Sequence, residues 1–472
     1  MRNSIVAAGV VATLAALAWG CDSAPEDPFH PELAAAGLAL GPPAWDVPLA
    51  WRGPGLPFPP EENPWPSIRE ERVRTLLGPA MTRAGVDAWL LILRENHNDP
   101  LASHVAGENA GGTAVFLFFR EGETGVRSVA LSPPGEATAL ADVGFHGEVV
   151  ALDAREGALN RAASLLREVN PARIAVNSSG LAVADGLSWT QRGFLEGALG
   201  SELSRRLVSS EELVIQWLSV KTPREVEIMA RAAEITAALE LEAYARVVPG
   251  LTTDAEVARY LKRRMAQLGV GDGWAPSQNP NVNSGPDRGH SHSTERVIRA
   301  GDVIQTDFGI RIWDMWVTDI QRFAYVLAPG ESTPPREMQE RWDAARAGNR
   351  AAFHAMRPGV RGVDVDRAQR AVMDAAGSLD VYWSTGHPVG FWAHDVGPSL
   401  GGGQRGRDPS PHAQRELLEG HVFAFDGFHS WELTGEEVGT KTISVEEMAV
   451  ITRDAAEWLI PPQEDLILIP SR

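Results

Sequence analysis

Residues 307–319, DFGIRIWDMWVTD, decide the fold. The flanking runs 303–310 (VIQTDFGI) and 318–327 (TDIQRFAYVL) are rich in β-branched and aromatic residues, as strands are, and the polar break near Asp314 suits a turn. The sequence therefore predicts a hairpin with Asp307 on its first strand and Asp319 on its second. Two buried acids that face each other repel unless a cation lies between them. The alternative is a pair of exposed aspartates that flank a loop.

The first twenty residues have the form of a secretory signal peptide. Arg2 precedes an apolar run, residues 5–19, that is too short to span a bilayer as a helix. Cys21, the only cysteine, follows, and residues 17–21 (LAWGC) resemble the lipoprotein box in which bacteria lipidate the cysteine. We expect a lipoprotein of the bacterial cell envelope, anchored through Cys21. Simple secretion and an uncleaved anchor are the alternatives.

Residues 21–66 are rich in proline and lack any hydrophobic periodicity. This composition predicts an extended tether that holds the body of the protein away from a membrane. The formal net charge of the chain is −19. Such an acidic balance argues against nucleic acid and against anionic lipid surfaces as partners.

Residues 67–217 are predicted to form an α/β domain. Apolar runs of strand length alternate with helical segments such as 159–169, which is typical of that class. A helix is expected from Ile68, with Ser67 as its N-cap. The runs that we expect to be strands are 88–93, 113–119, 127–131, 149–152 and 173–176.

Residues 218–472 are predicted to form a second domain that opens with two capped helices. Thr222 and Glu225 make a capping box for a helix that ends near Val248, and Thr253 caps a helix over 254–268. A loop rich in glycine and asparagine, 279–292, then leads to the hairpin.

Residues 220–235, VKTPREVEIMARAAEI, resemble the domain-opening helix of the metallopeptidase family that contains methionine aminopeptidase, aminopeptidase P and prolidase. The preceding domain resembles the creatinase-type N-terminal domain of the larger members. The resemblance implies an α/β N-terminal domain followed by an α+β catalytic domain with the pita-bread fold. It also implies a homodimer and five metal ligands, namely two Asp, one His and two further carboxylates.

Asp307 and Asp319 match the first two ligands of that pattern. They are twelve residues apart, where the family usually has eleven. The turn near Trp313 and Asp314 could absorb the extra residue. Otherwise Asp319 would be displaced, with Asp314 as a weak substitute.

His387 matches the family's metal-binding histidine, and His394 matches the histidine that contacts the substrate carbonyl. The two are seven residues apart in an HxxGxxxH pattern. Upstream, either His290 or His292 corresponds to the family's substrate-side histidine, and the spacing back from Gly301 favours His290. A neutral imidazole can bind a metal ion, and a protonated one can donate a hydrogen bond to an oxyanion.

Asp426 stands where the family has its fourth ligand, a glutamate, so its side chain is one methylene shorter. The backbone could move inward, one metal could be held more weakly, or water could fill the gap. Glu446 matches the bridging glutamate, and Glu447 should point to the other face of its strand. Ser444 stands where larger members often carry an arginine.

Four carboxylates and one imidazole form a hard, oxygen-rich donor set that favours Mn²⁺, with Co²⁺ or Zn²⁺ as alternatives. The resemblance implies two divalent ions and an activated water that attacks a peptide carbonyl, with Asp426 accepting its proton and His394 and His290 stabilising the intermediate. The expected substrate is a peptide, proline-containing in the proline-specific branch. Tryptophans that could wall its pocket are Trp313, Trp316, Trp383, Trp392 and Trp431.

Two other functions share this fold. One is a metal-free hydrolase like creatinase, against which the retained Asp307, Asp319, His387 and Glu446 argue. The other is a catalytically inactive surface binding protein, which the change at Asp426 and the extra hairpin residue keep open.

Overall fold

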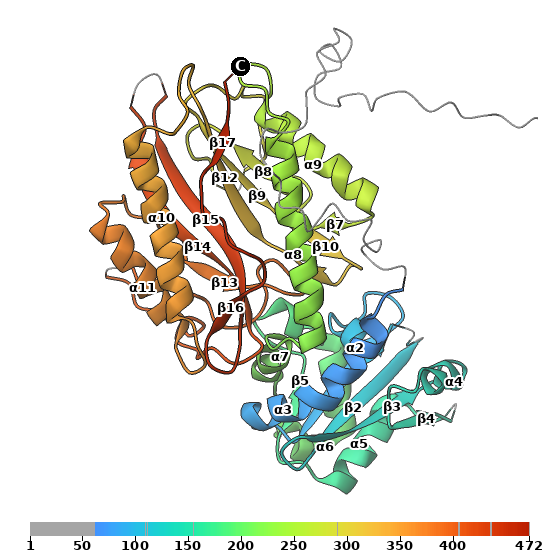
Figure 1. Cartoon of the computed structure of the whole chain (residues 1–472). Helices are drawn as coiled ribbons and strands as arrows, with labels where there is room; N and C mark the ends of the chain where they lie inside the picture. The colour runs from blue at the N-terminus through green and yellow to red at the C-terminus, as the bar shows by residue number, and fades with distance from the viewer. Residues whose placement is uncertain are drawn as a thin grey trace, which may run out of the picture. The chain divides into compact units, whose positions relative to one another are not determined.

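The N-terminal part of the chain forms a six-stranded mixed sheet (Figure 1). The computed structural model describes residues 62–471, apart from residues 109, 111, 154, 290, 405, 435 and 436. The strand order is β4-β3-β2-β1-β5-β6, with β1–β2 and β2–β3 antiparallel and the other pairs parallel. The strands are β1 (Ala88–Arg94), β2 (Thr113–Glu121), β3 (Gly125–Ser132), β4 (Glu148–Ala151), β5 (Ile174–Val176) and β6 (Leu207–Ser209).

Strand β1 is apolar throughout because both of its faces are buried. Trp89, Leu91 and Leu93 belong to one core cluster, whereas Leu90 and Ile92 belong to another on the opposite side. The predicted strands and the helix over 159–169 are each present within a few residues of their expected ends. The helices of this part are α2 (Trp65–Arg72), a short π-helix (Val73–Leu77), α3 (Gly78–Ala84), α4 (Pro134–Val143), α5 (Ala158–Val169), α6 (Trp189–Ser204) and α7 (Glu211–Leu218), with 3-10 turns at Ala102–Val105 and Ala182–Ala184.

The C-terminal part is built on a larger sheet that has eight strands within the described residues. Its order is β13-β14-β15-β12-β9-β8, while β16 pairs with β15 and β17 pairs with β12. Every pair except β12–β17 is antiparallel. The strands are β8 (Asn281–Asn283), β9 (Val303–Phe308), β12 (Ile320–Val326), β13 (Gly386–Pro388), β14 (Val422–Glu432), β15 (Thr440–Ile451), β16 (Ala456–Trp458) and β17 (Ile467–Ile469).

A small three-stranded sheet and four long helices complete this part (Figure 1). Helix α8 contacts β12, β9 and the small sheet, and α10 contacts β14 and β15. The small sheet has the order β11-β10-β7, with β7 at Gly271–Asp272, β10 at Ile310–Ile312 and β11 at Trp316–Val317. The helices are α8 (Pro223–Tyr244), α9 (Asp254–Leu268), α10 (Arg336–Ala355) and α11 (Gly362–Ala375).

The predicted helix caps of the second domain are confirmed. Thr222 accepts from the Glu225 amide, and the Glu225 side chain accepts from the Thr222 amide. Thr253 makes the same capping box with Glu256 at the start of α9. The predicted end of the first helix near Val248 is wrong, because α8 ends at Tyr244.

The first helix of the body begins earlier than the sequence suggested. Helix α2 starts at Trp65, and Ser67 lies inside its first turn, where its hydroxyl donates to the Pro64 carbonyl. The prediction of Ser67 as N-cap is therefore wrong. Pro66 is accommodated because the first turn of a helix has no partner for its amides in any case. Trp65 is buried, and its indole donates to the Ser103 carbonyl.

A buried ion pair joins α2 to the hairpin region. Arg72 lies 2.6 Å from Glu225, and both side chains are fully buried. The other carboxylate oxygen of Glu225 accepts from the Trp316 indole at 3.2 Å. The described residues all belong to one compact unit, Trp45–Arg472.

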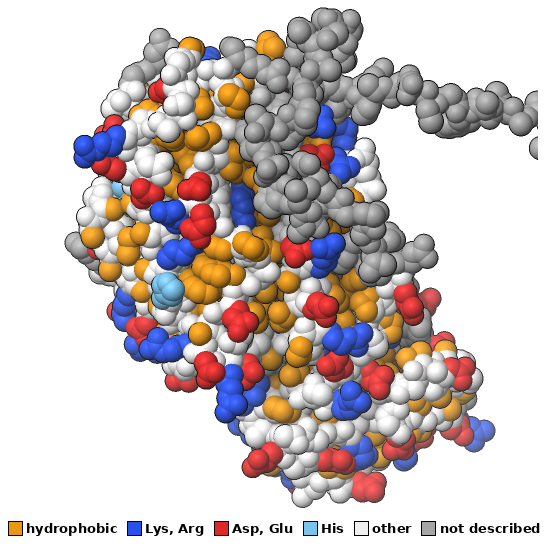
Figure 2. All heavy atoms as spheres, viewed as in Figure 1, with side chains coloured by type: hydrophobic (Ala, Val, Ile, Leu, Met, Phe, Trp, Pro, Cys, Tyr) orange, Lys and Arg blue, Asp and Glu red, His pale blue; other side chains and the backbone are white. Residues whose placement is uncertain are grey.

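The outer surface carries charges of both signs. On the face shown in Figure 2, basic side chains are interspersed with acidic ones. Among the described helices, none has both the length and the apolar composition needed to cross a bilayer. The predicted signal peptide, Cys21 and residues up to 61 of the predicted tether lie outside the described residues, and the expected membrane anchor stays a prediction.

Candidate metal and peptide site

A row of polar residues runs across the C-terminal sheet from strand to strand. Asp426 on β14 pairs with Glu446 on β15, and Glu446 pairs with Gln321 on β12. Gln321 in turn pairs with Asp307 on β9. Directly paired residues of neighbouring strands share one face of a sheet. The register therefore places Asp307 on the same face as Asp426 and Glu446, which lie more than a hundred residues further along the chain.

Asp319 and His387 complete the group around Glu446. Asp319 directly precedes β12, two residues before Gln321, so that strand alternation places it on the same face. The His387 Nε2 atom lies 3.8 Å from Asp319 Oδ2 and 3.8 Å from Glu446 Oε1. One ligand atom from each of these three residues falls within 4.8 Å of the others. Asp307, Asp426, Asp319 and Glu446 are all buried.

The acids of the site repel one another. Burial raises the pKa of Asp319 well above its usual range, and the charges of Glu446, Asp307 and Asp426 raise it further. Burial, Glu446 and Asp307 do the same to the pKa of Asp426. The pKa of Glu446 is raised to about 8, by burial first and then by Asp307.

The donor set fits a hard divalent cation. Oxygen ligands and one imidazole suit such ions, and two atoms bound about 2.1 Å from one ion lie roughly 3 to 4 Å apart. The two 3.8 Å separations at His387 agree with that geometry. A cation would also remove the repulsion that raises the pKa values of these acids.

A cavity of about 390 Å³ opens onto this group. Asp307, Asp319 and His394 line it, together with Trp274 and Trp392. His394 is exposed, and its ring centroid lies 4.2 Å from that of His387 in an edge-to-face arrangement. The cavity wall therefore combines acids, an imidazole and aromatic rings.

The comparisons with known proteins agree with this arrangement. Residues 227–453 match the model of metallopeptidase family M24. Over this stretch, just under half of its length, the chain is similar to that peptidase family. The protein named "Putative dipeptidase YkvY" of Bacillus subtilis is 24% identical over 288 residues, which are 60% of this chain and 71% of that protein. The protein named "Probable dipeptidase PepE" of Mycobacterium tuberculosis is 26% identical over 256 residues, 53% of this chain and 61% of that protein.

A solved structure gives the same picture of the fold. The Xaa-Pro dipeptidase of Bacillus anthracis superposes with a TM-score of 0.60 at 19% identity, and the match covers 86% of this chain and all of that one. The expected fold class, a creatinase-type α/β domain followed by a pita-bread catalytic domain, is confirmed.

The hairpin turns at Trp313 and Asp314, and how it accommodates the twelve-residue spacing stays a prediction. Trp313 and Asp314 both have left-handed backbones, with φ of 50° and 57°. Arg311 and Ile312 still pair with Val317 and Trp316 on either side of that turn. Asp319 stays beside His387 and Glu446, whereas Asp314 is exposed at the tip.

Gln321 is a member of the site that sequence reasoning missed. Its amide nitrogen lies 2.9 Å from Glu446 and 3.4 Å from Asp426, and donates to both. Its oxygen accepts from Gln305 at 2.6 Å and from the Ser444 hydroxyl at 2.8 Å. The signal was available, since β12 is an apolar strand with only Gln321 and Arg322 as polar residues, and Gln321 is two residues from Asp319.

Two hydrogen-bond donors support Asp426, and a helix packs closely beside it. The Trp383 indole and the Gln321 amide both hydrogen-bond its carboxylate. A Cβ on the next residue, Gly427, would lie 2.0 Å from the Ala345 carbonyl, so glycine lets α10 pack directly on β14. Asp307 and Asp426 lie in the same row but outside the tight group of Asp319, His387 and Glu446.

The loop that carries His394 is fixed by a buried ion pair. Asp395 accepts from Lys221 at 3.1 Å and from the Phe391 amide at 2.9 Å. A Cβ on Gly390 would lie 2.1 Å from Lys221 Cε and 2.6 Å from Asp395 Oδ2, so a larger residue would displace this ion pair. These contacts hold His394 at the cavity wall.

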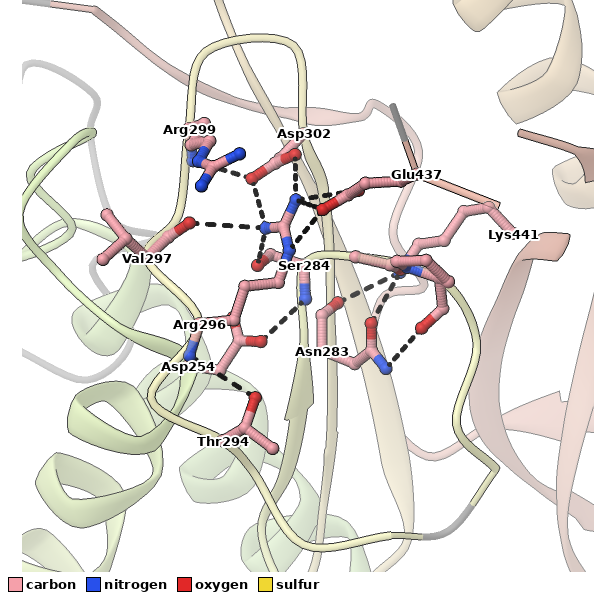
Figure 3. A network of polar contacts seen from close by, with 12 residues as sticks. Asp254, Asn283, Ser284, Thr294, Arg296, Val297, Arg299, Asp302, Glu437 and Lys441 are labelled. Carbon is pink, nitrogen blue, oxygen red and sulfur yellow. Dashed lines mark hydrogen bonds and ion pairs between the residues drawn. The ribbon is translucent and has the colours of Figure 1, made fainter. Parts of the chain in front are cut away.

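The loop that carries the upstream histidines is tied to β15 by a polar network (Figure 3). Buried Lys441 donates to the Asn283 carbonyl and side chain and to the Gly285 carbonyl, at 3.0 to 3.2 Å. Arg296 bridges Asp302 and Glu437. His290 lies outside the described residues and His292 is exposed, so the choice between them stays open.

The tryptophans that were expected to wall the pocket lie in different surroundings. Trp392 lines the cavity, as does Trp274, which was not expected. Trp316 is buried in the core, and Trp383 contacts Asp426 instead. The Arg341 guanidinium covers the ring of Trp431. Of the five tryptophans expected in the pocket, Trp392 is therefore the one that lines this cavity.

Proposed function

We propose that this chain is a metal-dependent peptidase of the Xaa-Pro aminopeptidase and prolidase type, which cleaves the peptide bond after the N-terminal residue of a short peptide. The observation that carries the proposal is the convergence of Asp319, His387 and Glu446 beside a cavity, with buried acids that repel one another. The printed names of the relatives, dipeptidase and Xaa-Pro dipeptidase, support a small peptide substrate.

The proposed metal ligands are Asp307, Asp319, His387, Asp426 and Glu446. A pair of divalent ions, Mn²⁺ first and Co²⁺ or Zn²⁺ as alternatives, would supply a hydroxide nucleophile and polarise the substrate carbonyl. The strand register, which places Asp307, Asp426 and Glu446 on one face, supports this assignment.

The other site residues would transfer protons and stabilise the oxyanion. Asp426 would accept the proton of the attacking water, and its hydrogen bonds from Gln321 and Trp383 fix the direction of its carboxylate. His394, exposed at the cavity wall, would donate to the developing oxyanion. His290, or alternatively His292, would assist from the loop that Lys441 holds.

The test is a metal and activity measurement on the purified full-length chain. After reconstitution with Mn²⁺, we expect about two equivalents of metal per chain and hydrolysis of Ala-Pro at a higher rate than Ala-Ala. Asp319→Asn should lose both metal and activity. Asp343→Asn, on the half-exposed surface of α10, is the matched control and should lose neither.

Each other result points to a named alternative. One equivalent of metal with turnover would mean that Asp426 does not complete a dinuclear site. Turnover without metal would favour a creatinase-like hydrolase. Neither metal nor turnover would favour a surface binding protein of the same fold.

We also propose that Cys21 is lipidated in the bacterial cell envelope and that the chain forms a homodimer. Metabolic labelling with a fatty-acid analogue should mark the chain and fail for Cys21→Ser. Sedimentation of the purified chain should give twice the monomer mass; monomer mass would reject the dimer.

A further inference from the structure

Arg311 brings a positive charge into the wall of the cavity that holds Asp307, Asp319 and His394. It lies on β10, in the arm of the hairpin between the two aspartates. None of the roles proposed above uses it. A buried or half-buried charge beside a reaction site calls for a physical explanation.

Three main-chain carbonyls fix the direction of the Arg311 guanidinium. Its Nη1 donates to the Phe391 carbonyl at 3.0 Å. Its Nε and Nη2 donate to the carbonyls of Asp272 and Gly273, each at 3.3 Å. The first carbonyl belongs to the loop that carries His394, and the others belong to the segment that carries Trp274. The guanidinium is therefore held between the two sides of the cavity.

The charge of Arg311 is not neutralised by an ion pair in the described part of the chain. Burial lowers the pKa of Arg311, and Asp314 and Asp395 raise it only from a distance. Asp395 is already paired with Lys221. A guanidinium has five N–H groups, and the contacts above use three of them, so donors remain for a ligand in the cavity.

We propose that Arg311 binds the free α-carboxylate of a dipeptide substrate. This deepens the proposed function and rests on it. A guanidinium can bind a carboxylate with two parallel hydrogen bonds. In a dipeptide, the carboxylate carbon lies roughly 3 to 3.7 Å from the scissile carbonyl carbon, so a residue that binds that carboxylate must share the cavity with the metal site. The volume of about 390 Å³, walled by Trp274 and Trp392, suits a ligand of that size.

The test compares Ala-Pro with its C-terminal amide on the Mn²⁺-reconstituted full-length chain. The wild type should prefer the free acid by about 10- to 100-fold in kcat/KM, mainly through KM, as expected for a charge-assisted pair. Arg311→Gln should reduce this preference to within about threefold of unity. Arg311→Lys, which keeps the charge but not the planar fork, should retain part of it.

A matched control separates recognition from support of the loops. Arg120→Gln also removes an arginine that binds two main-chain carbonyls, those of Val86 and Gly122, but it lies on β2 of the N-terminal sheet. It should keep the preference for the acid. Equal rates for acid and amide in the wild type, or an equal loss of both rates in Arg311→Gln, would overturn the inference.

Calorimetric binding of the same two compounds distinguishes this inference from the proposed function. If the wild type hydrolyses neither compound but binds the acid more tightly, and Arg311→Gln does not, the peptidase proposal fails and the carboxylate site stands. If neither compound binds, or both bind equally, the carboxylate site is wrong. Turnover of both compounds at equal rates leaves the peptidase standing and removes the carboxylate site.

Discussion

The neighbouring glutamates Glu446 and Glu447 lie on opposite faces of the C-terminal sheet and have different electrostatic surroundings. Glu447 points to one face, as the sequence predicted, where it lies 3.0 Å from Arg322 and accepts from the Gln463 amide at 2.6 Å. Glu446 points to the other face, where its side chain has no ion pair with a lysine or arginine among the described residues. Burial, followed by the charge of Asp307, raises its pKa. A buried acid that the fold itself neutralises serves structure, and one that it leaves unneutralised marks where a cation from solution would bind.

The first prediction separates the two glutamates by stability. Glu447→Gln leaves Arg322 buried without its charge partner, so the free energy of unfolding should fall by about 3 kcal/mol. Glu446→Gln removes a charge that its neighbours repel, so in the presence of a chelator the same quantity should change by less than about 1 kcal/mol. Urea denaturation of both variants with chelator measures the difference.

In metal binding, the order of the two variants should be reversed. Glu447→Gln should retain bound Mn²⁺ while it is folded, and Glu446→Gln should lose it together with activity. If both variants lost stability to the same extent, the contrast between the faces would be wrong.

The second prediction concerns metal removal. An ion that binds only the folded chain adds about 2.7 kcal/mol to the free energy of unfolding at a free concentration of 100 times its Kd. Mn²⁺ should therefore raise the Tm of the wild type, and a chelator should reverse the rise. Glu446→Gln should show no such shift. A shift of equal size in that variant would place the ion elsewhere.

The third prediction tests Gln321. Its amide orients Glu446 and Asp426 by hydrogen bonds at 2.9 and 3.4 Å. Gln321→Ala should weaken Mn²⁺ binding about 10- to 100-fold, as loss of a residue that orients metal ligands usually does. Gln339→Ala on the exposed side of α10 is the control. Unchanged affinity in a metal titration would show that the carboxylates need no such support.

The fourth and smallest effect concerns Glu240 on α8. Burial, followed by the charges of Asp307, Glu447 and Glu446, raises its pKa well above the usual range, although Arg322 opposes this. The folded chain thus keeps a proton that the unfolded chain releases above a pH of about 4.3. The stability that this group contributes is complete below that pH and declines as the pH rises.

Glu240→Met should therefore raise the free energy of unfolding by about 1 kcal/mol at pH 8 and have less effect near pH 4. Denaturation curves across this pH range, with chelator present, measure the change. The exposed Glu227→Met on the same helix is the control and should show no pH-dependent difference.

Local patterns were enough to predict most elements of the fold. The apolar run of β1 and the capping boxes at Thr222 and Thr253 depend on neighbours in sequence, and each is present. The start of α2 was missed because burial of Trp65, through contacts distant in sequence, extends the helix past the capping signal of Ser67.

The sequence was enough to predict which residues form the site, but not the strand register and side-chain contacts that arrange them. The order Asp, Asp, His, Asp and Glu along the chain could be matched to a family pattern, and the structure brings Asp319, His387 and Glu446 together. The register that aligns Gln321 with Glu446 depends on pairing between strands 125 residues apart, for which no short pattern exists. The indole that contacts Asp426 depends in the same way on how Trp383 packs beside β14.

The hairpin turns at Trp313 and Asp314, which have left-handed backbones and lie away from the acids Asp307 and Asp319. Because β10 and β11 pair below the turn, a residue added at the tip does not propagate to Asp307 or Asp319. The tip is thus a position where we expect a change in length to leave these acids in place. For the same reason it is a suitable point at which to graft a short epitope or a fluorophore attachment sequence into this protein.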